Sequence, residues 1–333
     1  MPEPLLQVKD LTVTFPNAKG GVRAVRGVDY SVGEGEFLGI VGESGSGKSV
    51  SSLAVMGLLP SSAKITGDIT FRGESLLGMS DRALSKLRGR EMAMIFQDPL
   101  SALTPVYTVG QQIVEALTLH DKNVPQRSAE KRAVELLKIV GIPAAERRVK
   151  AFPHEFSGGM RQRAMIAIAI ANDPALIVAD EPTTALDVTI QAQILEVLQK
   201  AKEVTGAAVV LITHDLGVVA GNVDRVAVMY AGKVVEEGPV GPLMGGPLHP
   251  YPRGLLGATV HPVMRGKRLT TIPGAPPSLE RAPTGCPFAP RCPEVEEPAC
   301  TAAMPAPRSP VPGPPPAARR PPWHRTTRGP ARG

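Results

Sequence analysis

The sequence predicts an α/β fold built around a parallel sheet. A short apolar run at 37–41 is followed by a glycine-rich loop at 42–49 and then by apolar residues at helical spacing up to residue 58. Segments with helical spacing also separate the later apolar runs that have the length of buried strands. Those runs are 92–96, 176–179 and 207–213. Strands that alternate with helices in this way are typical of parallel sheets covered by helices.

The glycine-rich loop has the pattern G-x-x-x-x-G-K-[ST], which binds the phosphates of nucleotides. Its glycines let the chain curl so that successive backbone N–H groups face one anion, and the following helix adds the positive end of its dipole. The lysine can reach the β- and γ-phosphates, and the serine hydroxyl can bind Mg²⁺. The predicted phosphate-binding residues are Gly42, Glu43, Ser44, Gly45, Ser46, Gly47, Lys48 and Ser49. The strand and helix on either side argue against the alternative, a surface glycine turn.

Short β-leaning runs near the N-terminus predict a small antiparallel sheet before the first parallel strand. The runs are 6–8, 11–15, 22–25 and 28–32. Phe15 ends one of these runs, where an aromatic ring serves either the core or the stacking of a purine base. At the other end of the domain, runs at 225–229 and 233–237 predict a hairpin.

Two amphipathic segments, 109–119 and 128–140, predict a helical insertion within this strand-and-helix domain. Ser128 is the expected N-cap of the second helix, and Gly141 is its expected end. A third helix is predicted to start after Ser157, with two glycines that leave its first N–H groups open to an anion.

Polar side chains stand where the predicted parallel strands end. They are Gln97, Asp180, Glu181 and His214. Taken singly, Asp180 and Glu181 could cap a helix and His214 could be an ordinary loop histidine. Ligands of open α/β sheets bind at the carboxyl ends of the strands, so together these residues predict one site beside the glycine-rich loop.

The net charge of +6 resides in the C-terminal tail, because residues 302–333 contain six arginines and no lysine or acidic residue. A neutral body argues against nucleic-acid binding by the folded part. The proline-rich tail is predicted to be disordered, and it either contacts anionic lipid or has no partner. The apolar runs are too short to span a bilayer and the first residues do not form a signal peptide, so we expect a cytosolic-side protein.

Together these motifs resemble the ATPase subunits of ABC transporters. The glycine-rich loop is similar to the Walker A motif, and 176–180 to the Walker B strand. The remaining matches are Gln97 to the Q-loop, 156–160 to the signature, Glu181 to the glutamate after Walker B, 185–187 to the D-loop, and His214 to the H-loop. The resemblance implies that Phe15 stacks on adenine. It also implies a RecA-like P-loop NTPase core with an N-terminal antiparallel β subdomain, a helical insertion and a loop-rich C-terminal extension.

A narrower resemblance joins the chain to the dipeptide and oligopeptide importers. It rests on residues 97–99, 156–163 and 180–189, and on a C-terminal region that includes 249–251, 272–277 and 285–292. Met160 in place of glutamine resembles the D-type subunit of these importers. The implied domains are an ATPase domain at 1–240 with its insertion at about 98–160, an extension at 241–301 and the tail at 302–333.

The resemblance implies ATP hydrolysis with Mg²⁺. The implied catalytic residues are Lys48, Gln97, Glu181 and His214, and the implied Mg²⁺ ligands are Ser49, Gln97 and Asp180. Ser157, Gly158 and Gly159 would contact ATP held by a second ATPase subunit, identical or paralogous, and Asp187 would lie at the same interface.

Transport further implies two transmembrane permease subunits, an extracytoplasmic solute-binding protein, and a peripheral location at the cytoplasmic face of the inner membrane. The motifs are shared by nickel and other solute importers, so the cargo stays open. A soluble regulatory ABC protein acting on ribosomes or DNA is disfavoured, because the chain has one glycine-rich loop and no heptad run.

Three cysteines, Cys286, Cys292 and Cys300, lie in the extension with spacing C-x5-C-x7-C. A cytosolic chain disfavours disulfides, and the spacing is looser than that of a zinc ribbon. Related importers carry a fourth cysteine that would complete an iron–sulfur cluster. Here Trp323 and His324 stand near its place, so reduced thiols, a [4Fe-4S] cluster and zinc all remain open.

Overall fold

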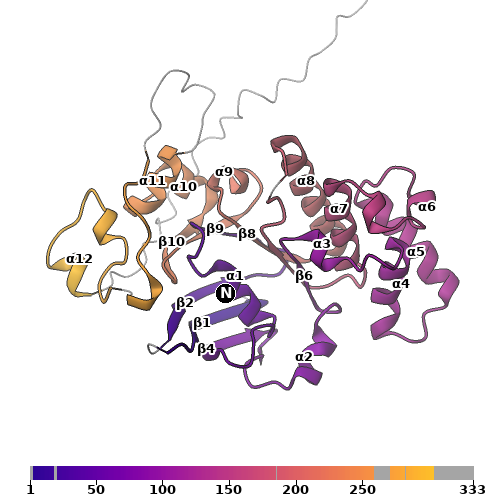
Figure 1. Ribbon diagram of the computed structural model, residues 1–333, viewed down its shortest axis with the longest axis horizontal. Helices are drawn as coiled ribbons and strands as arrows, with labels where there is room; N and C mark the ends of the chain where they lie inside the picture. Colours follow the sequence, from indigo (N-terminus) through magenta and orange to yellow (C-terminus); the bar gives the residue numbers. More distant parts are fainter. Residues whose placement is uncertain (1–2, 19–20, 185, 259–270, 282, 304–333) are drawn as a thin grey trace, which may run out of the picture.

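The computed structural model describes residues 3–18, 21–184, 186–258, 271–281 and 283–303. A central sheet runs through the molecule, and a smaller antiparallel sheet lies along one side of it (Figure 1). Most helices of residues 99–169 gather at one end of the molecule, and helices α10, α11 and α12, which lie between residues 240 and 302, stand toward the opposite end. Within the described residues, no helix combines the length and apolarity that crossing a membrane requires.

The central sheet has the strand order β10-β9-β3-β8-β7-β6. Its strands are β3 (Phe37–Val41), β6 (Met92–Ile95), β7 (Leu176–Asp180), β8 (Ala208–Thr213), β9 (Arg225–Tyr230) and β10 (Lys233–Pro239). All pair in parallel except β10, which forms the predicted hairpin with β9. Every residue of β3, β7 and β8 is buried, as expected for strands covered on both faces. Val41 lies opposite Thr213, so the carboxyl ends of β3 and β8 meet at one edge.

The smaller sheet is antiparallel, as predicted, with the strand order β2-β1-β4-β5. Its strands are β1 (Leu6–Phe15), β2 (Val22–Val32), β4 (Lys64–Phe71) and β5 (Glu74–Ser75). The prediction of four short strands before residue 33 was wrong, because β1 and β2 are each continuous and their pairing shifts register after Val8. Asp10 and Gly27 have φ of 45° and 82°, so the polar residues that interrupt the apolar pattern mark bulges.

Apart from the predicted insertion, five helices connect the strands of the two sheets. They are α1 (Lys48–Val55), α2 (Asp81–Leu87), α7 (Gly158–Ala169), α8 (Val188–Thr205) and α9 (Leu216–Val219). Helix α1 begins directly after the glycine-rich loop, as predicted. Helix α8 ends at Gly206, whose φ of 70° suits a glycine C-cap.

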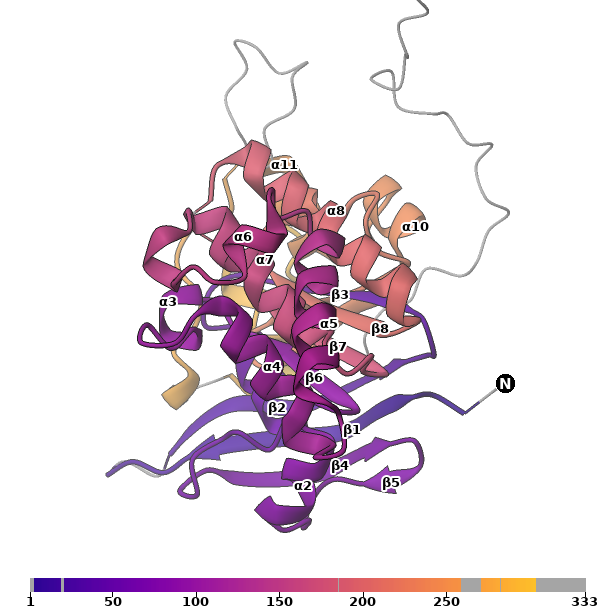
Figure 2. The ribbon, with the colours of Figure 1, turned by 90° about the vertical axis from the view of Figure 1, so that its right-hand side faces the viewer.

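The insertion packs α4 and α5 side by side (Figure 2). Its elements are α3 (Pro99–Ala102), α4 (Val109–His120), α5 (Gln126–Ile139), α6 (Ala145–Arg148) and the 3-10 helix η1 (Pro153–Glu155). The prediction that Ser128 caps the second helix was wrong. Helix α5 starts earlier, after Pro125, whose carbonyl accepts from Ser128 N at 2.8 Å, whereas Gly141 ends the helix as predicted with φ of 71°.

The C-terminal extension packs against the central sheet. It contains α10 (Val240–Gly245), α11 (Pro250–Ala258), the 3-10 helices η3 (Leu279–Arg281) and η4 (Ala289–Arg291), and α12 (Ala299–Ala302). Leu243, Tyr251 and Phe288 are buried in the same apolar cluster as strands β3 and β9. The predicted disordered tail lies outside the described residues from position 304 onward.

Candidate nucleotide-binding site

The glycine-rich loop sits where β3 ends and α1 begins, and two of its glycines are required by close packing. A Cβ atom on Gly42 would collide with the Met229 carbonyl of β9, and one on Gly47 would collide with the Ala24 carbonyl of β2. Gly47 also has φ of 96°, which side chains rarely adopt. In contrast, Gly45 has open space beside it. The loop is therefore packed against neighbouring strands at its two ends and open at its middle.

Lys48 is held at the centre of this loop. Its side chain is only 4% exposed, and Nζ donates to the carbonyl oxygens of Gly42 at 2.8 Å and Glu43 at 3.1 Å. Burial lowers the pKa of Lys48, while the carboxylates of Glu181 and Asp180 act in the opposite direction. The ammonium group thus lies among the loop carbonyls with an acidic group 4.0 Å away.

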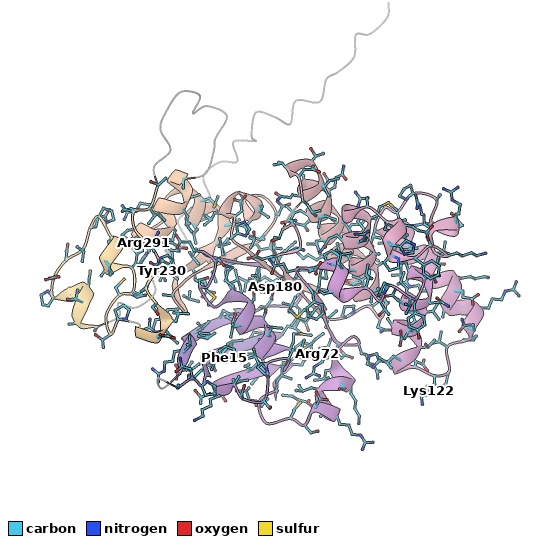
Figure 3. The ribbon with its side chains drawn as sticks, in the orientation of Figure 1. Phe15, Arg72, Lys122, Asp180, Tyr230 and Arg291 are labelled. Atoms are coloured by element: carbon cyan, nitrogen blue, oxygen red, sulfur yellow. The ribbon has the colours of Figure 1, made fainter. Side chains whose placement is uncertain are left out.

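Ser49 and Asp180 meet between α1 and the end of β7. The Ser49 hydroxyl donates to Asp180 Oδ1 at 2.8 Å. Burial raises the pKa of Asp180, and the Ser49 hydrogen bond partly offsets that rise. Figure 3 shows Asp180 near the middle of the molecule. A hydroxyl and a carboxylate at this distance match the hard oxygen ligands that Mg²⁺ prefers.

The two remaining predicted catalytic residues, Gln97 and His214, both lie next to Glu181. Its Oε2 accepts from Gln97 Nε2 at 3.3 Å and lies 3.4 Å from His214 Nδ1. Thr184 Oγ1 also donates to Oε2, at 2.8 Å, a contact that the sequence reasoning missed. Glu181 itself has φ of 45°, in the left-handed region that is costly for a residue with a Cβ. Three loops from different strand ends thus converge on one carboxylate in a strained backbone position.

The signature segment lies elsewhere. Ser157 caps α7 by accepting from Met160 N at 3.4 Å, and Ser157 and Gly158 are exposed while Gly159 is half-buried. Helix α7 stands at the insertion end of the molecule, apart from α1 (Figure 1). Across the described ranges, no hydrogen bond or ion pair joins 157–159 to 42–49. The structure therefore does not bring the signature to the loop of its own chain.

Within the described ranges, two other predicted residues, Asp187 and Phe15, make no hydrogen bond to the glycine-rich loop. Asp187 is exposed and caps α8, with Oδ1 accepting from Ile190 N at 3.0 Å. Its neighbour in the predicted D-loop, Ala185, lies outside the described residues. Phe15 is half-buried at the end of β1 and pairs with Val22. Val22 lies two residues before Ala24, whose carbonyl packs against Gly47.

Glu43 turns away from the loop toward the C-terminal extension. Its carboxylate accepts from Arg291 Nη1 at 2.9 Å, and its backbone N–H donates to the Tyr251 hydroxyl at 2.9 Å. From the sequence, both residues were included only in the C-terminal region that resembles the importers, and they were given no role at the loop. No local pattern links them to the loop, since Arg291 is 248 positions away from Glu43.

The three cysteines lie together in the extension. Burial raises the pKa of Cys286 and of Cys292, and the neighbouring thiols add to the rise. All three are free cysteines. Within the part of the chain that the structure describes, no group of three or more His, Cys, Asp or Glu side chains is placed to hold a metal ion. His324, the suggested fourth ligand, lies outside the described residues.

Two known protein families match different parts of this chain. The family described as ABC transporter matches residues 25–184, and the family described as oligopeptide/dipeptide transporter, C-terminal region, matches 235–300. Among solved structures, the dimeric structure of MJ0796 bound to ADP and Pi superposes with a TM-score of 0.63 at 30% identity. That match covers 71% of this chain and 98% of the other. CbiO1 of Clostridium perfringens superposes with a TM-score of 0.62 at 26% identity, over 73% of this chain and 92% of its own.

Curated relatives are more similar in sequence. The chain is 50% identical over 301 residues to the oligopeptide transport ATP-binding protein OppD of Escherichia coli, covering 90% of this chain and 89% of that protein. It is 52% identical over 293 residues to the dipeptide transport ATP-binding protein DppD of Bacillus subtilis, covering 87% of each. OppD of Mycobacterium tuberculosis is 57% identical over 300 residues, which cover 90% of this chain. The chain spans about half the length of such mycobacterial relatives, at 49%.

The fold is the P-loop NTPase cassette fold, as predicted. The chain belongs to the ABC transporter family, in its group of oligopeptide and dipeptide transport ATP-binding proteins.

Proposed function

We propose that this chain is the ATP-hydrolysing subunit that energises an ABC importer of dipeptides or oligopeptides. The observation that carries the proposal is the convergence of Gln97, Thr184 and His214 on Glu181 beside the glycine-rich loop. The printed names of its OppD and DppD relatives favour peptide cargo over nickel or another solute. No observation favours the regulatory alternative.

The glycine-rich loop would supply most of the contacts with the phosphates of ATP. Its open middle exposes backbone N–H groups to the phosphates, and Lys48 is positioned to reach the β- and γ-phosphates. Phe15 offers a ring for the adenine base from the end of β1. Ser49 and Asp180, with Gln97 opposite, would hold Mg²⁺, which neutralises charge on the phosphate oxygens.

Glu181 would orient and deprotonate the water that attacks the γ-phosphorus, with the P–O bond to ADP breaking as the new one forms. Hydrogen bonds from Gln97 and Thr184 hold the carboxylate before the substrate binds, and His214 Nδ1 lies 3.4 Å from the same oxygen. His214, whose side chain is 58% exposed, would contact the γ-phosphate from the end of β8. Catalysis here is positioning combined with electrostatic stabilisation.

Two chains would share each nucleotide. The exposed Ser157 and the half-buried Gly159 would reach the γ-phosphate held by the loop of a second ATPase subunit, identical or paralogous, with Asp187 at the same interface. The dimeric MJ0796 structure, bound to ADP and Pi, supports such pairing. An importer further needs two membrane permease subunits and a solute-binding protein, which would place this chain at the cytoplasmic face of the membrane.

Residues 1–240 would form the ATPase domain, with the insertion at about 98–160 transmitting its motion to the permeases. Residues 241–301 would form the extension. For its three cysteines we infer reduced, unliganded thiols. The chain has three cysteines, whereas four thiolates hold a [4Fe-4S] cluster.

The Glu181→Gln variant tests the catalytic assignment. Removing the carboxylate while keeping its shape should lower ATP turnover about a hundredfold or more, because general-base catalysis contributes at least that much. The affinity for ATP–Mg²⁺ should stay within about twofold, since the phosphate contacts are untouched. Turnover is measured as phosphate release from the chain assembled with its partner subunits.

The matched control is Glu203→Gln, an exposed glutamate near the end of α8. It should turn over ATP at the wild-type rate. Normal turnover by the Glu181→Gln variant in the same assay would refute the role given to Glu181.

A further inference from the structure

The C-terminal extension touches the phosphate-binding loop directly. Three residues far apart in the chain meet there, Glu43 of the loop and Tyr251 and Arg291 of the extension. The contacts use both the side chain and the backbone of Glu43, so they constrain its backbone as well as its carboxylate. Figure 3 shows Arg291 beside Tyr230, on the side of the molecule where the extension lies.

Arg291 is almost fully buried at this contact, with a side chain 7% exposed. It donates to the Glu43 carboxylate at 2.9 Å, to the Tyr230 hydroxyl at 3.1 Å and to the Pro273 carbonyl at 2.8 Å. A buried guanidinium with three acceptors is fixed in place, and losing it would leave the Glu43 carboxylate without its partner. The pair is therefore a rigid link rather than a loose surface ion pair.

Aromatic packing fixes the link on the extension side. The ring of Tyr230 lies 4.6 Å from that of Tyr251 and 5.3 Å from that of Phe288, measured between centroids. Tyr230 is the last residue of β9, and its neighbour Met229 is the residue whose carbonyl packs against Gly42. The same few residues thus hold the start of the loop from both the strand and the extension.

The position of Glu43 within the loop connects the extension to Lys48. Glu43 lies between Gly42, which is packed on β9, and the open turn at Gly45. Its carbonyl accepts from Lys48 Nζ, so a shift of Glu43 would move the lysine that reaches the phosphates. A displacement at this residue is therefore transmitted to the phosphate-binding groups themselves.

We propose that Arg291 and Tyr251 are positioning residues for nucleotide binding, which hold the first turn of the phosphate-binding loop in shape through Glu43. The proposal rests on the ATP-binding role given to the loop above. It makes the affinity for ATP–Mg²⁺ depend on whether the extension is docked, and so makes the extension part of the nucleotide site.

Four full-length single variants test the link, together with Glu43→Gln alone and combined with Arg291→Met. Arg291→Met removes the guanidinium and keeps much of the volume, and Tyr251→Phe removes only the hydroxyl acceptor. Arg253→Met is the matched control, because Arg253 pairs with Glu294 at 2.8 Å within the extension. The fourth variant, Arg291→Lys, retains the positive charge. ATP–Mg²⁺ binding is measured by calorimetric titration, alongside thermal unfolding of each variant.

We expect Arg291→Met to weaken ATP–Mg²⁺ binding about tenfold, as fits the loss of a hydrogen bond to a charged group, and Arg253→Met to change it less than about twofold. Arg291→Lys should recover part of the loss, and Tyr251→Phe should weaken binding about threefold. Combining Glu43→Gln with Arg291→Met should add little to the larger single effect, because both changes break one link. A merely structural role would lower the unfolding temperature without this coupling.

Wild-type affinity in the Arg291→Met variant, or single effects that simply add, would overturn the link. Failure of the proposed function looks different. In that case the wild-type chain would bind no ATP–Mg²⁺, or would bind it equally well after Lys48→Ala, and both proposals would fall together.

Discussion

Glu181 is the residue on which the account depends most. It stands in a left-handed backbone conformation, yet three side chains from separate loops hold its carboxylate. A strained position of this kind persists only where its surroundings enforce it, and such positions cluster at functional sites. The residue types at the strand ends predicted the site, but the part played by Thr184 came only from the geometry.

At the same scale, the cysteines of the extension give a pH-dependent test. Burial raises the pKa of Cys286 above its ordinary value of 9.0, so the thiol stays protonated to a higher pH than a free cysteine. Only the thiolate reacts with alkylating reagents. Labelling of Cys286 in the native chain should therefore be slow at neutral pH and should speed up as the pH rises past 9.0, as measured by peptide mass spectrometry.

The same sample decides whether the thiols are free. Anaerobically purified protein should show no absorbance in the iron–sulfur region, and a chelator should leave the labelling rate unchanged. An iron–sulfur spectrum, or labelling that appears only after chelation, would contradict the assignment of reduced thiols.

At the scale of elements, the placement of α7 separates the two halves of the proposed nucleotide site. The signature caps a helix at the insertion end, while the loop caps α1 beside the central sheet. Neither the signature nor the loop of one chain can complete the proposed site alone if both must contact the same triphosphate. The proposed sharing between two chains follows from that separation.

Ser157→Arg tests this arrangement. The added bulk and charge should leave ATP–Mg²⁺ affinity of the isolated chain within about twofold, because the substitution lies away from its own loop. It should abolish turnover at the site formed with the partner subunit. Calorimetric titration and phosphate release measure the two quantities. A loss of affinity in the isolated chain as large as that caused by Lys48→Ala would contradict sharing between chains.

The bounds of the strands and helices were predicted from the sequence in some places and not in others. The buried strands were predicted closely, because runs such as 176–179 are uniformly apolar and end at polar residues. The full lengths of the bulged strands β1 and β2 were not predicted, since the residues at 9–10 and 26–27 interrupt the apolar pattern and look like strand ends. The start of α5 was misplaced because Pro125 already supplies the first carbonyl acceptor, three residues before Ser128.

At the scale of the whole molecule, the loop is held from several directions at once. Strand β2 packs on Gly47, strand β9 packs on Gly42, and the extension binds Glu43. The last of these contacts joins positions 248 residues apart, so no local sequence pattern could reveal it. The extension is therefore joined to the rest of the chain through the glycine-rich loop, as well as through the shared apolar cluster.

The central claim is that ATP closes two such subunits around shared nucleotides. Sedimentation of the Glu181→Gln chain mixed with its cognate ATPase subunit tests it most directly. With ATP–Mg²⁺ we expect a species with the summed mass of both chains, which ADP does not produce and which Ser157→Arg abolishes. Separate chains in saturating ATP–Mg²⁺, or equal pairing in ADP, would contradict the account.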